Sequence, residues 1–542
     1  MPTEEERPVV LIHRIPSLKQ PLASLSERFT LLDPLLHSAD STHSFLSRHA
    51  SSVRAILCLG PSPLTSDTLS LLPALEIVVG SSAGIDHVDL QECRRRGILV
   101  TNAGNAFSED GADYVVGLLI DVLRRVSSSD RFVRNGLWPE HGAYPLGSTL
   151  GGKRVGIVGL GSIGSEVAKR LVPFGCSIAY TSRKKKPGVS YPFYANVSGL
   201  AADSDVLIVC CALTEETHHM INKDVMTALG KEGVIINVGR GALIDEKELV
   251  HFLVRGKLGG AGLDVFEDEP HVPKELLTLD NVVLSPHVAV VTAESFAALE
   301  QVVIGNLEAF FSNKPLLSPV KLDYNCLAGK TELVKATDKA EPIAKQADLL
   351  IVADLAVGLL IDFLRRISPS NWYVRAGLWA KTGDYPLGFK VSSESLGGMQ
   401  VGIVRLGNIG SELLNRLQAF GFIISYNSRR KRPSVLFPNC ANVYDLAVNS
   451  DVLVVCCALT EQTHHIINKD VMAELGKGGM IINVGRGALI DEKEMLQFLV
   501  QVEINGVGLD AFENDPNVPK EPLRLDNIVP LPCQNALTHW ES

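Results

Sequence analysis

A long internal repeat constrains this chain more than any other feature. The segment INVGRGALIDEKE occupies residues 236–248 and returns unchanged at 482–494. Further upstream, the stretch ADYVVGLLIDVLRR from Ala112 returns as ADLAVGLLIDFLRR from Ala353. The distance along the sequence between the two occurrences is shorter for this second segment than for the first. A polar insert in the second copy, KVSSES, lies between the two segments and accounts for the difference. A spacing this long exceeds the roughly 20–50 residues of a solenoid unit, so the chain contains a duplicated domain.

The two copies are not equally complete. The second copy, residues 348–542, has no counterpart of the first hundred residues or so, nor of those from about 293 onward. A polar, weakly periodic segment at 319–347 precedes it, and we interpret this segment as a junction.

Charge and composition exclude several classes of protein. The net charge of −10 gives no support to nucleic-acid binding. The longest apolar stretch is interrupted by Asp354 and ends at Asp362, which argues against a membrane span. The N-terminus, MPTEEERPVV, lacks a signal-peptide pattern. Ten scattered cysteines form no disulfide framework, and His218-His219 has no Cys/His cluster beside it. We therefore expect a cytoplasmic protein without a metal site.

Short apolar runs predict the fold class. VVLIHR, VRAILCL, LEIVVG, RVGIVGL, SIAYTS, VLIVCCA and VIINVG resemble buried parallel strands, and amphipathic segments separate several of them. Strands that alternate with helices indicate an α/β fold.

A glycine-rich turn predicts a dinucleotide site. In RVGIVGLGSIGSEVAKRL, three glycines stand at the GxGxxG spacing, after a predicted strand and before a predicted helix. The first glycine allows a tight turn, the second lets the backbone approach the pyrophosphate, and the third lets the helix pack on the strand. The pyrophosphate would lie at the helix N-terminus. The predicted cofactor residues of this turn are Gly159, Leu160, Gly161, Ser162, Ile163 and Gly164.

The end of the next predicted strand indicates which dinucleotide is bound. NAD-binding folds place an acidic residue there, to hold the ribose 2′-hydroxyl. This chain has Ser182, Arg183 and Lys184 instead, and a guanidinium with a neighbouring hydroxyl suits a 2′-phosphate. We therefore predict that NADP(H) is preferred over NAD(H). A simple solvated basic run remains the alternative.

Three later segments carry residues suited to the reduction of a 2-oxo acid. They are NVGRGALID with Arg240, GLDVFEDEP with Asp264 and Glu269, and SPH with His287. A guanidinium binds a carboxylate bidentately. A histidine paired with a carboxylate has its acid form stabilised and can donate a proton near neutral pH.

In these motifs the chain resembles the D-isomer-specific 2-hydroxyacid dehydrogenases, and within them plant glyoxylate/hydroxypyruvate and hydroxyphenylpyruvate reductases. The resemblance covers residues 1 to about 320 and much of the rest a second time. It implies an NAD(P)-dependent enzyme with a Rossmann-type cofactor domain and a flavodoxin-like substrate domain. Residues 1–104 and 288–318 would form the substrate domain, and residues 105–287 the cofactor domain. The active site would lie in the cleft between these two domains.

The resemblance also implies a role for each matching residue. Arg240 would bind the substrate carboxylate and polarise the ketone, His287 would donate the proton, and Glu269 would be its carboxylate partner. Asp264, with Val238 and Gly239, would contact the cofactor. The remaining assignments are backbone N–H groups of Ala83 and Gly84 on the substrate carboxylate, and Trp138 reaching a partner subunit's site. For Trp138, simple packing is an equal alternative.

The same motifs are altered in the second copy. Arg405 replaces the first glycine, Asp515 replaces the glutamate and Cys533 replaces the histidine. Arg486 and Asp510 persist. We predict that residues 348–542 form a truncated, degenerate Rossmann-like domain that carries no hydride transfer. They could pair with the first copy where a homodimer partner would dock, be a poorly folded remnant, or come from a gene-model fusion that no cell makes.

Other functions remain open at this stage. C-terminal binding protein corepressors resemble the same family, so a nucleotide-sensing binding protein is the alternative from another class. Within the enzymes, phosphoglycerate dehydrogenase usually has a different tail, and formate dehydrogenase has glutamine where this chain has Glu269. The preferred 2-oxo acid and the choice between a homodimer and intramolecular pairing remain open.

Overall fold

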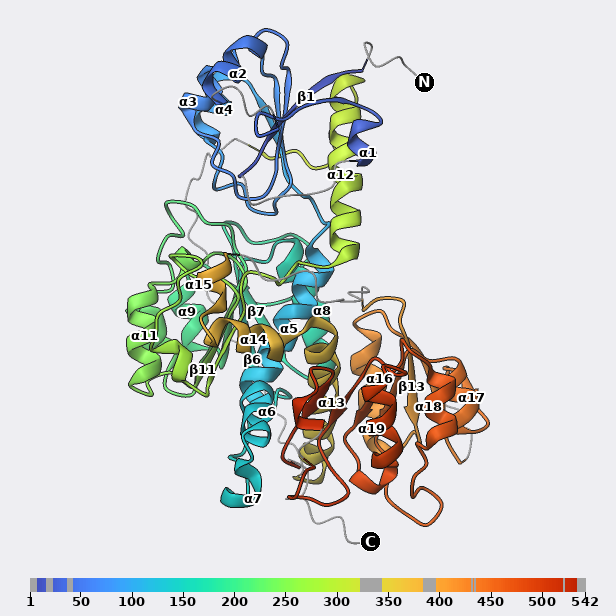
Figure 1. Ribbon diagram of the computed structural model, residues 1–542. Helices are drawn as coiled ribbons and strands as arrows, with labels where there is room; N and C mark the ends of the chain where they lie inside the picture. Colours follow the sequence, from blue (N-terminus) through green and yellow to red (C-terminus); the bar gives the residue numbers. More distant parts are fainter. Residues whose placement is uncertain are drawn as a thin grey trace. The chain divides into compact units, whose positions relative to one another are not determined.

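The computed structural model describes residues 7–15, 23–36, 42–321, 344–383, 396–429, 432, 435–519 and 522–533. The chain divides into two compact units (Figure 1). Unit 1 comprises residues 1–109, 212–215 and 293–333, and unit 2 comprises residues 110–211, 216–292 and 334–542. Unit 2 therefore holds the second copy together with most of the first copy's predicted cofactor domain. Most of the predicted junction, residues 322–343, and the insert KVSSES lie outside the described residues.

Unit 1 is built on a five-stranded parallel sheet in the order β2-β1-β3-β4-β5. This is the strand order of flavodoxin-like folds. The strands are β1 (Val9–His13), β2 (Thr30–Leu32), β3 (Ala55–Cys58), β4 (Ile77–Gly80) and β5 (Leu99–Thr101). The helices are α1 (Ala23–Ser26), α2 (Thr42–His49), α3 (Ser66–Ser70), α4 (Leu90–Arg96) and α12 (Ala293–Phe311).

The cofactor domain of the first copy has a seven-stranded parallel sheet in the order β12-β11-β10-β9-β6-β7-β8. The chain reverses direction across the sheet between β6 and β9, as in a Rossmann fold. The strands are β6 (Arg154–Val158), β7 (Ser177–Thr181), β8 (Phe193–Tyr194), β9 (Val206–Val209), β10 (Val234–Asn237), β11 (Gly260–Leu263) and β12 (Val282–Leu284). The predicted α/β fold class is confirmed.

Helices and short 3-10 turns connect these strands. The α-helices are α5 (Ser108–Arg124), α6 (Val126–Arg134), α7 (Leu137–His141), α8 (Ser162–Leu171), α9 (Val197–Ala202), α10 (Lys223–Leu229) and α11 (Glu246–Val254). The 3-10 turns are η2 (Val172–Phe174), η3 (Gly241–Leu243) and η4 (Leu276–Thr278). No helix in the described part of the chain is long and apolar enough to cross a membrane.

The second copy repeats this architecture strand for strand, with the order β15-β14-β13-β16-β17-β18-β19. Its strands are β13 (Gln400–Val404), β14 (Ile423–Asn427), β15 (Asn439–Cys440), β16 (Val452–Val455), β17 (Met480–Asn483), β18 (Gly506–Leu509) and β19 (Ile528–Pro530). Its helices are α13 (Ala344–Arg365), α14 (Ile367–Arg375), α15 (Leu378–Thr382), α16 (Asn408–Gln418), α17 (Val443–Val448), α18 (Lys469–Leu475) and α19 (Glu492–Val500), with the 3-10 turns η5 (Gly487–Leu489) and η6 (Pro522–Arg524).

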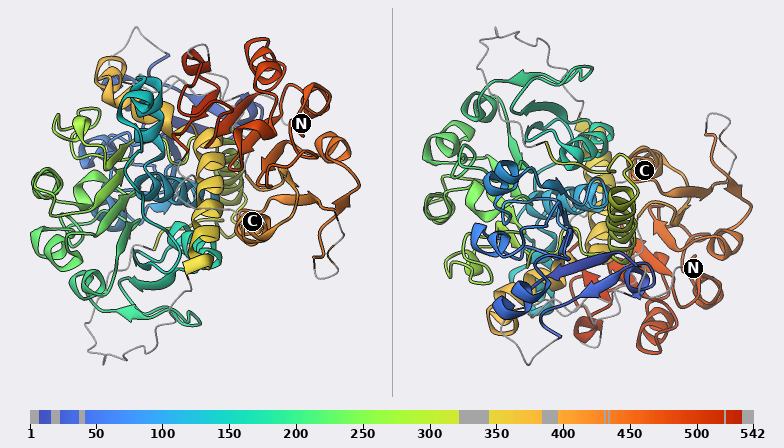
Figure 2. Two further views of the ribbon diagram at one scale, coloured as in Figure 1. Left: turned by 90° about the horizontal axis from the view of Figure 1, so that it is seen from below. Right: turned by 90° about the horizontal axis from the view of Figure 1, so that it is seen from above.

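The two copies pack on each other through α5 and α13, and Figure 2 shows α13 in yellow between them. The contact is reciprocal, because each helix places a glycine against an isoleucine of the other. A Cβ atom added to Gly117 would lie 2.6 Å from Ile361, and one added to Gly358 would lie 2.4 Å from Ile120. A side chain at either glycine would therefore force the helices apart. Of the alternatives that the sequence left open for the second copy, the structure has the one in which it packs on the first copy.

Aromatic rings and arginines extend this contact symmetrically. The rings of Phe174 and Phe420 meet edge to face, with their centroids 6.4 Å apart. Arg170 lies over the ring of Phe420, and Arg416 lies over the ring of Phe174. Each guanidinium also forms a buried ion pair within its own copy, Arg170 with Asp113 and Arg416 with Asp354. The copies thus share one continuous core.

Candidate active site

The glycine turn between β6 and α8 has the geometry of a pyrophosphate site. Gly159 has a φ of +100°, and a Cβ atom there would lie 2.7 Å from the backbone of Cys211. A Cβ atom on Gly164 would lie 2.3 Å from the carbonyl oxygen of Gly159, whereas nothing lies within 4 Å of one on Gly161. The backbone is therefore open at Gly161, directly before the N-terminus of α8, where helical N–H groups point outward. These features fit a bound dinucleotide.

The other residues of this turn have different surroundings. Leu160 is buried, and Ile163 packs against Gly111 of α5. At the end of β7, Arg183 and Lys184 are exposed, and the hydroxyl of Ser182 donates to the carbonyl of Lys184 at 2.7 Å. Two cationic side chains therefore extend from the strand end where the ribose of a dinucleotide would lie.

Arg240 follows a tightly hydrogen-bonded loop after β10. The side chain of Asn237 accepts from the N–H of Gly239 at 3.0 Å and donates to the carbonyl of Arg240 at 2.9 Å. The N–H of Val238 donates to Val209. A Cβ atom on Gly241 would lie 1.9 Å from the carbonyl carbon of Phe266, so this glycine lets the Arg240 loop approach the segment that carries Glu269. Asn237 and Gly241 were not among the predicted site residues, although both lie within NVGRGALID.

His287 and Glu269 form the predicted pair. Nδ1 of His287 lies 2.8 Å from Oε2 of Glu269, and the other carboxylate oxygen accepts from the N–H of Phe266 at 3.0 Å. The backbone of His287 has a φ of +56°, a conformation that costs a non-glycine residue about 1 kcal/mol. The donation of its N–H to the carbonyl of Asp264 at 2.8 Å helps to hold it there.

The surroundings of His287 favour its protonated form. Burial lowers the pKa of His287, but the hydrogen bond and charge of Glu269, together with the charge of Asp264, raise it more. The positive charge of Arg240 acts in the opposite direction. The net result is a pKa above the ordinary 6.5, so more of the imidazolium form is present at neutral pH than in a free histidine.

Asp264 organises the loop that carries His287. Its Oδ1 accepts from the hydroxyl of Ser285 at 2.7 Å and from the N–H of Val288 at 2.9 Å, and its Oδ2 accepts from the N–H of Ala289 at 2.9 Å. Burial nevertheless raises its pKa. Asp264 therefore links β11 to the residues on both sides of His287.

The remaining predicted residues lie elsewhere. In unit 1, Ala83 is exposed in the loop after β4, with its carbonyl accepting from Asn102, and Gly84 follows it. In unit 2, the indole of Trp138 meets Phe512 of the second copy at 6.4 Å between ring centroids. Its counterpart Trp379 meets Phe266 of the first copy at 5.7 Å. Trp379 therefore contacts the segment that holds Glu269, and Trp138 contacts the equivalent segment of the second copy.

The second copy keeps the framework of the site but differs from the first at Arg405, Asp515 and Cys533. Arg405 has a φ of +64° at the position of Gly159, and one hydrogen bond of the turn comes from a donor one residue later. In the first copy the N–H of Gly159 donates to Thr181, whereas in the second the N–H of Leu406 donates to Asn427, the counterpart of Thr181. Asp515 still accepts from Phe512, as Glu269 does from Phe266, but its neighbour is Cys533.

The adjacent histidines are engaged in the structure. Nε2 of His219 lies 2.6 Å from the carboxylate of Glu267, and its ring stacks on His218. In the second copy, His464, His465 and Glu513 place ligand atoms within 4.8 Å of one another, close enough to hold a metal ion. In both copies the His–Glu contact links the loop before α10 or α18 to the segment after β11 or β18.

Comparison with known proteins assigns the family. The model of the D-isomer specific 2-hydroxyacid dehydrogenase, NAD binding domain, matches residues 116–289 and again residues 357–533. The chain belongs to this family, and the duplication carries the same domain twice.

Individual relatives agree with this assignment. The chain is 58% identical over 323 residues to glyoxylate/hydroxypyruvate reductase HPR3 of Arabidopsis thaliana, a match that covers 60% of this chain and all of that relative. It is 48% identical over 296 residues to hydroxyphenylpyruvate reductase of Plectranthus scutellarioides, which covers 55% of this chain and 94% of the relative. The structure of an NADPH-dependent glyoxylate/hydroxypyruvate reductase from Sinorhizobium meliloti, in complex with NADP and malonate, superposes with a TM-score of 0.54. That match has 38% identity and covers 60% of this chain and all of the other.

Proposed function

We propose that the first copy reduces a small 2-oxo acid, such as hydroxypyruvate or glyoxylate, to the D-2-hydroxy acid with NADPH. The hydrogen-bonded pair of His287 and Glu269 is the observation that carries this proposal. The nicotinamide would supply the hydride. The overall reaction is 2-oxo acid + NADPH + H⁺ → D-2-hydroxy acid + NADP⁺.

Each residue has a role in this scheme. Arg240 binds the substrate carboxylate and polarises the ketone. Because Nδ1 of His287 is hydrogen-bonded to Glu269, Nε2 is the nitrogen that would donate a proton to the ketone oxygen. Glu269 keeps the imidazole oriented and protonated. The N–H groups of Ala83 and Gly84 are proposed as further ligands of the substrate carboxylate.

We propose the same cofactor residues as the sequence indicated. They are Gly159, Leu160, Gly161, Ser162, Ile163, Gly164, Ser182, Arg183, Lys184, Val238, Gly239 and Asp264. The open backbone at Gly161 supports pyrophosphate binding, and the cations at the end of β7 support a preference for the 2′-phosphate. Trp379 is proposed to border this site because it contacts Phe266. Trp138 is still proposed to reach a partner's site, since it lies against Phe512 of the second copy.

One assay tests this function. The full chain is incubated with NADPH or NADH and one of three acids: hydroxypyruvate, glyoxylate or hydroxyphenylpyruvate. The rate of cofactor oxidation is then measured. We expect oxidation with the small acids and a preference for NADPH. Arg183→Asp should shift that preference toward NADH by about tenfold, because it places an acid beside the ribose. The matched variant Arg429→Asp, in the second copy, should change nothing.

Two outcomes would contradict the proposal. A folded chain that oxidises neither cofactor with any of the three acids would favour a binding protein. An unchanged cofactor ratio in Arg183→Asp would mean that the 2′-phosphate is held by other residues.

A further inference from the structure

Three side chains of the second copy form hydrogen bonds with the backbone of the first copy on either side of His287. They come from α13 and α14, and they contact the backbone of the first copy between η4 and the residues after His287. The three residues are Arg365, Asn371 and Arg375.

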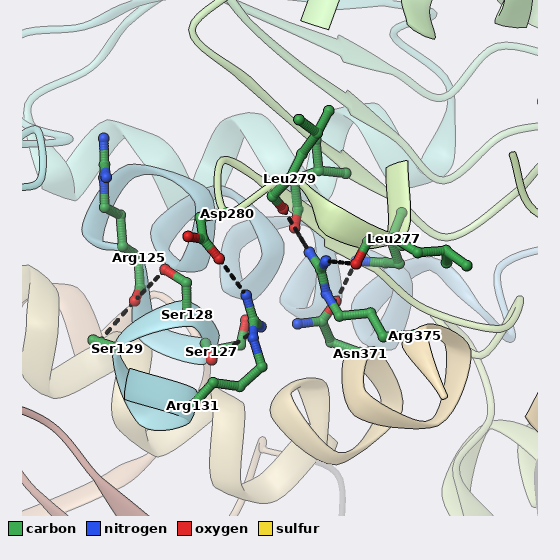
Figure 3. A network of polar contacts seen from close by, with 12 residues as sticks. Arg125, Ser127, Ser128, Ser129, Arg131, Leu277, Leu279, Asp280, Asn371 and Arg375 are labelled. Atoms are coloured by element: carbon green, nitrogen blue, oxygen red, sulfur yellow. Dashed lines mark hydrogen bonds and ion pairs between the residues drawn. The ribbon is translucent and has the colours of Figure 1, made fainter. Parts of the chain in front are cut away.

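Arg375 binds the chain before β12. Its guanidinium donates to the carbonyl oxygens of Leu277 at 2.5 Å, Leu279 at 2.8 Å and Val282 at 2.5 Å. Its Nε also donates to the side chain of Asn371 at 3.0 Å. Figure 3 shows the guanidinium of Arg375 between these partners. One arginine thus fixes the segment that leads from Glu269 into β12.

Asn371 and Arg365 hold the chain closer to His287. The side-chain oxygen of Asn371 accepts from the N–H of Leu284 at 3.1 Å, at the last residue of the edge strand β12. Arg365 donates to the carbonyl of Ala289 at 2.7 Å and forms a buried ion pair with Asp110. The second copy therefore contacts the backbone on both sides of His287.

The reciprocal contacts are not all present. Arg134, the counterpart of Arg375, donates to the carbonyls of Leu523, Leu525 and Ile528 in the second copy. The counterpart of Leu284, however, is Pro530, which has no N–H to donate. The counterpart of Asp110 is Ile351, whose backbone carbonyl accepts from Arg124. The differences at Pro530 and Ile351 thus remove contacts from the second copy that are present in the first, which is the copy that keeps His287.

We propose that the second copy acts as a positioning subunit within the same chain. Its Arg375, Asn371 and Arg365 hold the backbone around His287, so that the imidazole stays in contact with Glu269. This inference rests on the proposed function of the first copy. His287 lies in a left-handed conformation between the contacts of Asn371 and Arg365, so a looser backbone would relax toward a conformation that separates the imidazole from Glu269. Small displacements of a reacting group cost large factors in rate.

The test compares matched variants of the full chain. Arg375→Ala removes three carbonyl contacts from the copy with His287, and Arg134→Ala removes the equivalent three from the second copy. We expect Arg375→Ala to lower kcat by about ten- to a hundredfold with little change in the NADPH dissociation constant. Arg134→Ala should stay within about twofold of the parent chain. Asn371→Ala, which loses a single acceptor toward β12, should lie between them and serves as the milder variant if Arg375→Ala does not fold.

Two further readouts separate positioning from a general loss of stability. The pH above which kcat falls should move lower in Arg375→Ala, because His287 loses part of its contact with Glu269. Amide hydrogen exchange over residues 282–289 should become about tenfold faster in Arg375→Ala and Asn371→Ala but not in Arg134→Ala.

Equal kcat values for Arg375→Ala and Arg134→Ala, with equal exchange over residues 282–289, would overturn the inference. A parent chain without reductase activity would instead overturn the proposed function. The exchange measurement would still decide whether the second copy holds this segment.

Discussion

The two copies show how differently a fold and a catalytic site respond to substitution. Both build the same seven-stranded sheet, and both keep the arginine after β10 or β17, at Arg240 and Arg486. Sheet formation depends on many buried apolar residues, which can be exchanged for others of similar size at small cost. The proposed site depends on a few groups: one glycine turn, one imidazole and one carboxylate. A duplicated domain can therefore change its site residues while its packing surface is retained.

The largest effect is expected from the imidazole itself. His287→Ala removes the proposed proton donor and should lower the reduction rate by about 10²–10⁴-fold, with NADPH affinity almost unchanged. Cys533→Ala, at the matching position of the second copy, should leave turnover as it is. The measurement is kcat for glyoxylate together with an NADPH titration. Full turnover in His287→Ala would remove His287 from the mechanism.

The glycine turn should give the next largest effect. Gly159→Arg copies the second copy's residue into the first, where a Cβ atom would lie 2.7 Å from Cys211 at a φ of +100°. We expect NADPH affinity to fall by at least about tenfold, which corresponds to about 1.4 kcal/mol. The reverse change, Arg405→Gly, should add no reductase activity because Cys533 remains. Quenching of protein fluorescence by NADPH measures the affinity, and an unaltered value would show that the turn tolerates a side chain.

A smaller effect should appear as a change in pH dependence. Glu269 raises the pKa of His287, so Glu269→Gln should bring that pKa down. The proposed reduction needs the protonated imidazole, so its rate should fall as pH rises through this pKa. The falling limb of the kcat profile should therefore move to lower pH, with kcat at neutral pH reduced by about tenfold. Asp515→Asn is the matched control. If the falling limb of the profile does not move, it reports the titration of a group other than His287.

The smallest effect concerns a carboxylate in the shared core. Burial, with the charge of Asp121, raises the pKa of Asp362 from 3.8 to about 8. Because the pKa of Asp362 is higher in the folded than in the unfolded protein, the free energy of unfolding decreases as pH rises from 3.8 to about 8. Asp362→Asn should remove that loss and raise the melting temperature at pH 9 relative to the parent by about 2–4 °C. Thermal melts at pH 6 and pH 9 measure this, and equal shifts at both would contradict it.

Much of this organisation is visible in the sequence because it depends on local patterns. The seven apolar runs named at the outset correspond to β1, β3, β4, β6, β7, β9 and β10. The motifs around Glu269 and His287 predicted a pair, and their side chains meet at 2.8 Å. The two-residue strands β8 and β15 carry too little apolar pattern to be recognised in this way.

The contacts between the copies could not be predicted in the same way. Arg375 binds carbonyl oxygens, which every residue has, so no motif marks its partners. Asn371 matters through the N–H of Leu284, and the difference from Pro530 has meaning only once β12 and β19 are known to be edge strands. The changed hydrogen bond in the turn at Arg405 likewise depends on how the backbone relaxes around a side chain.

The glycine contacts between α5 and α13 have a consequence for dilution. When two separate chains associate through such helices, lowering their concentration pulls them apart. Here Gly117 and Gly358 join two parts of one polypeptide, so the encounter is intramolecular and its effective concentration is set by the connecting chain. Specific activity that rests on this contact should stay constant as the protein is diluted, down to concentrations at which a two-chain enzyme would have dissociated.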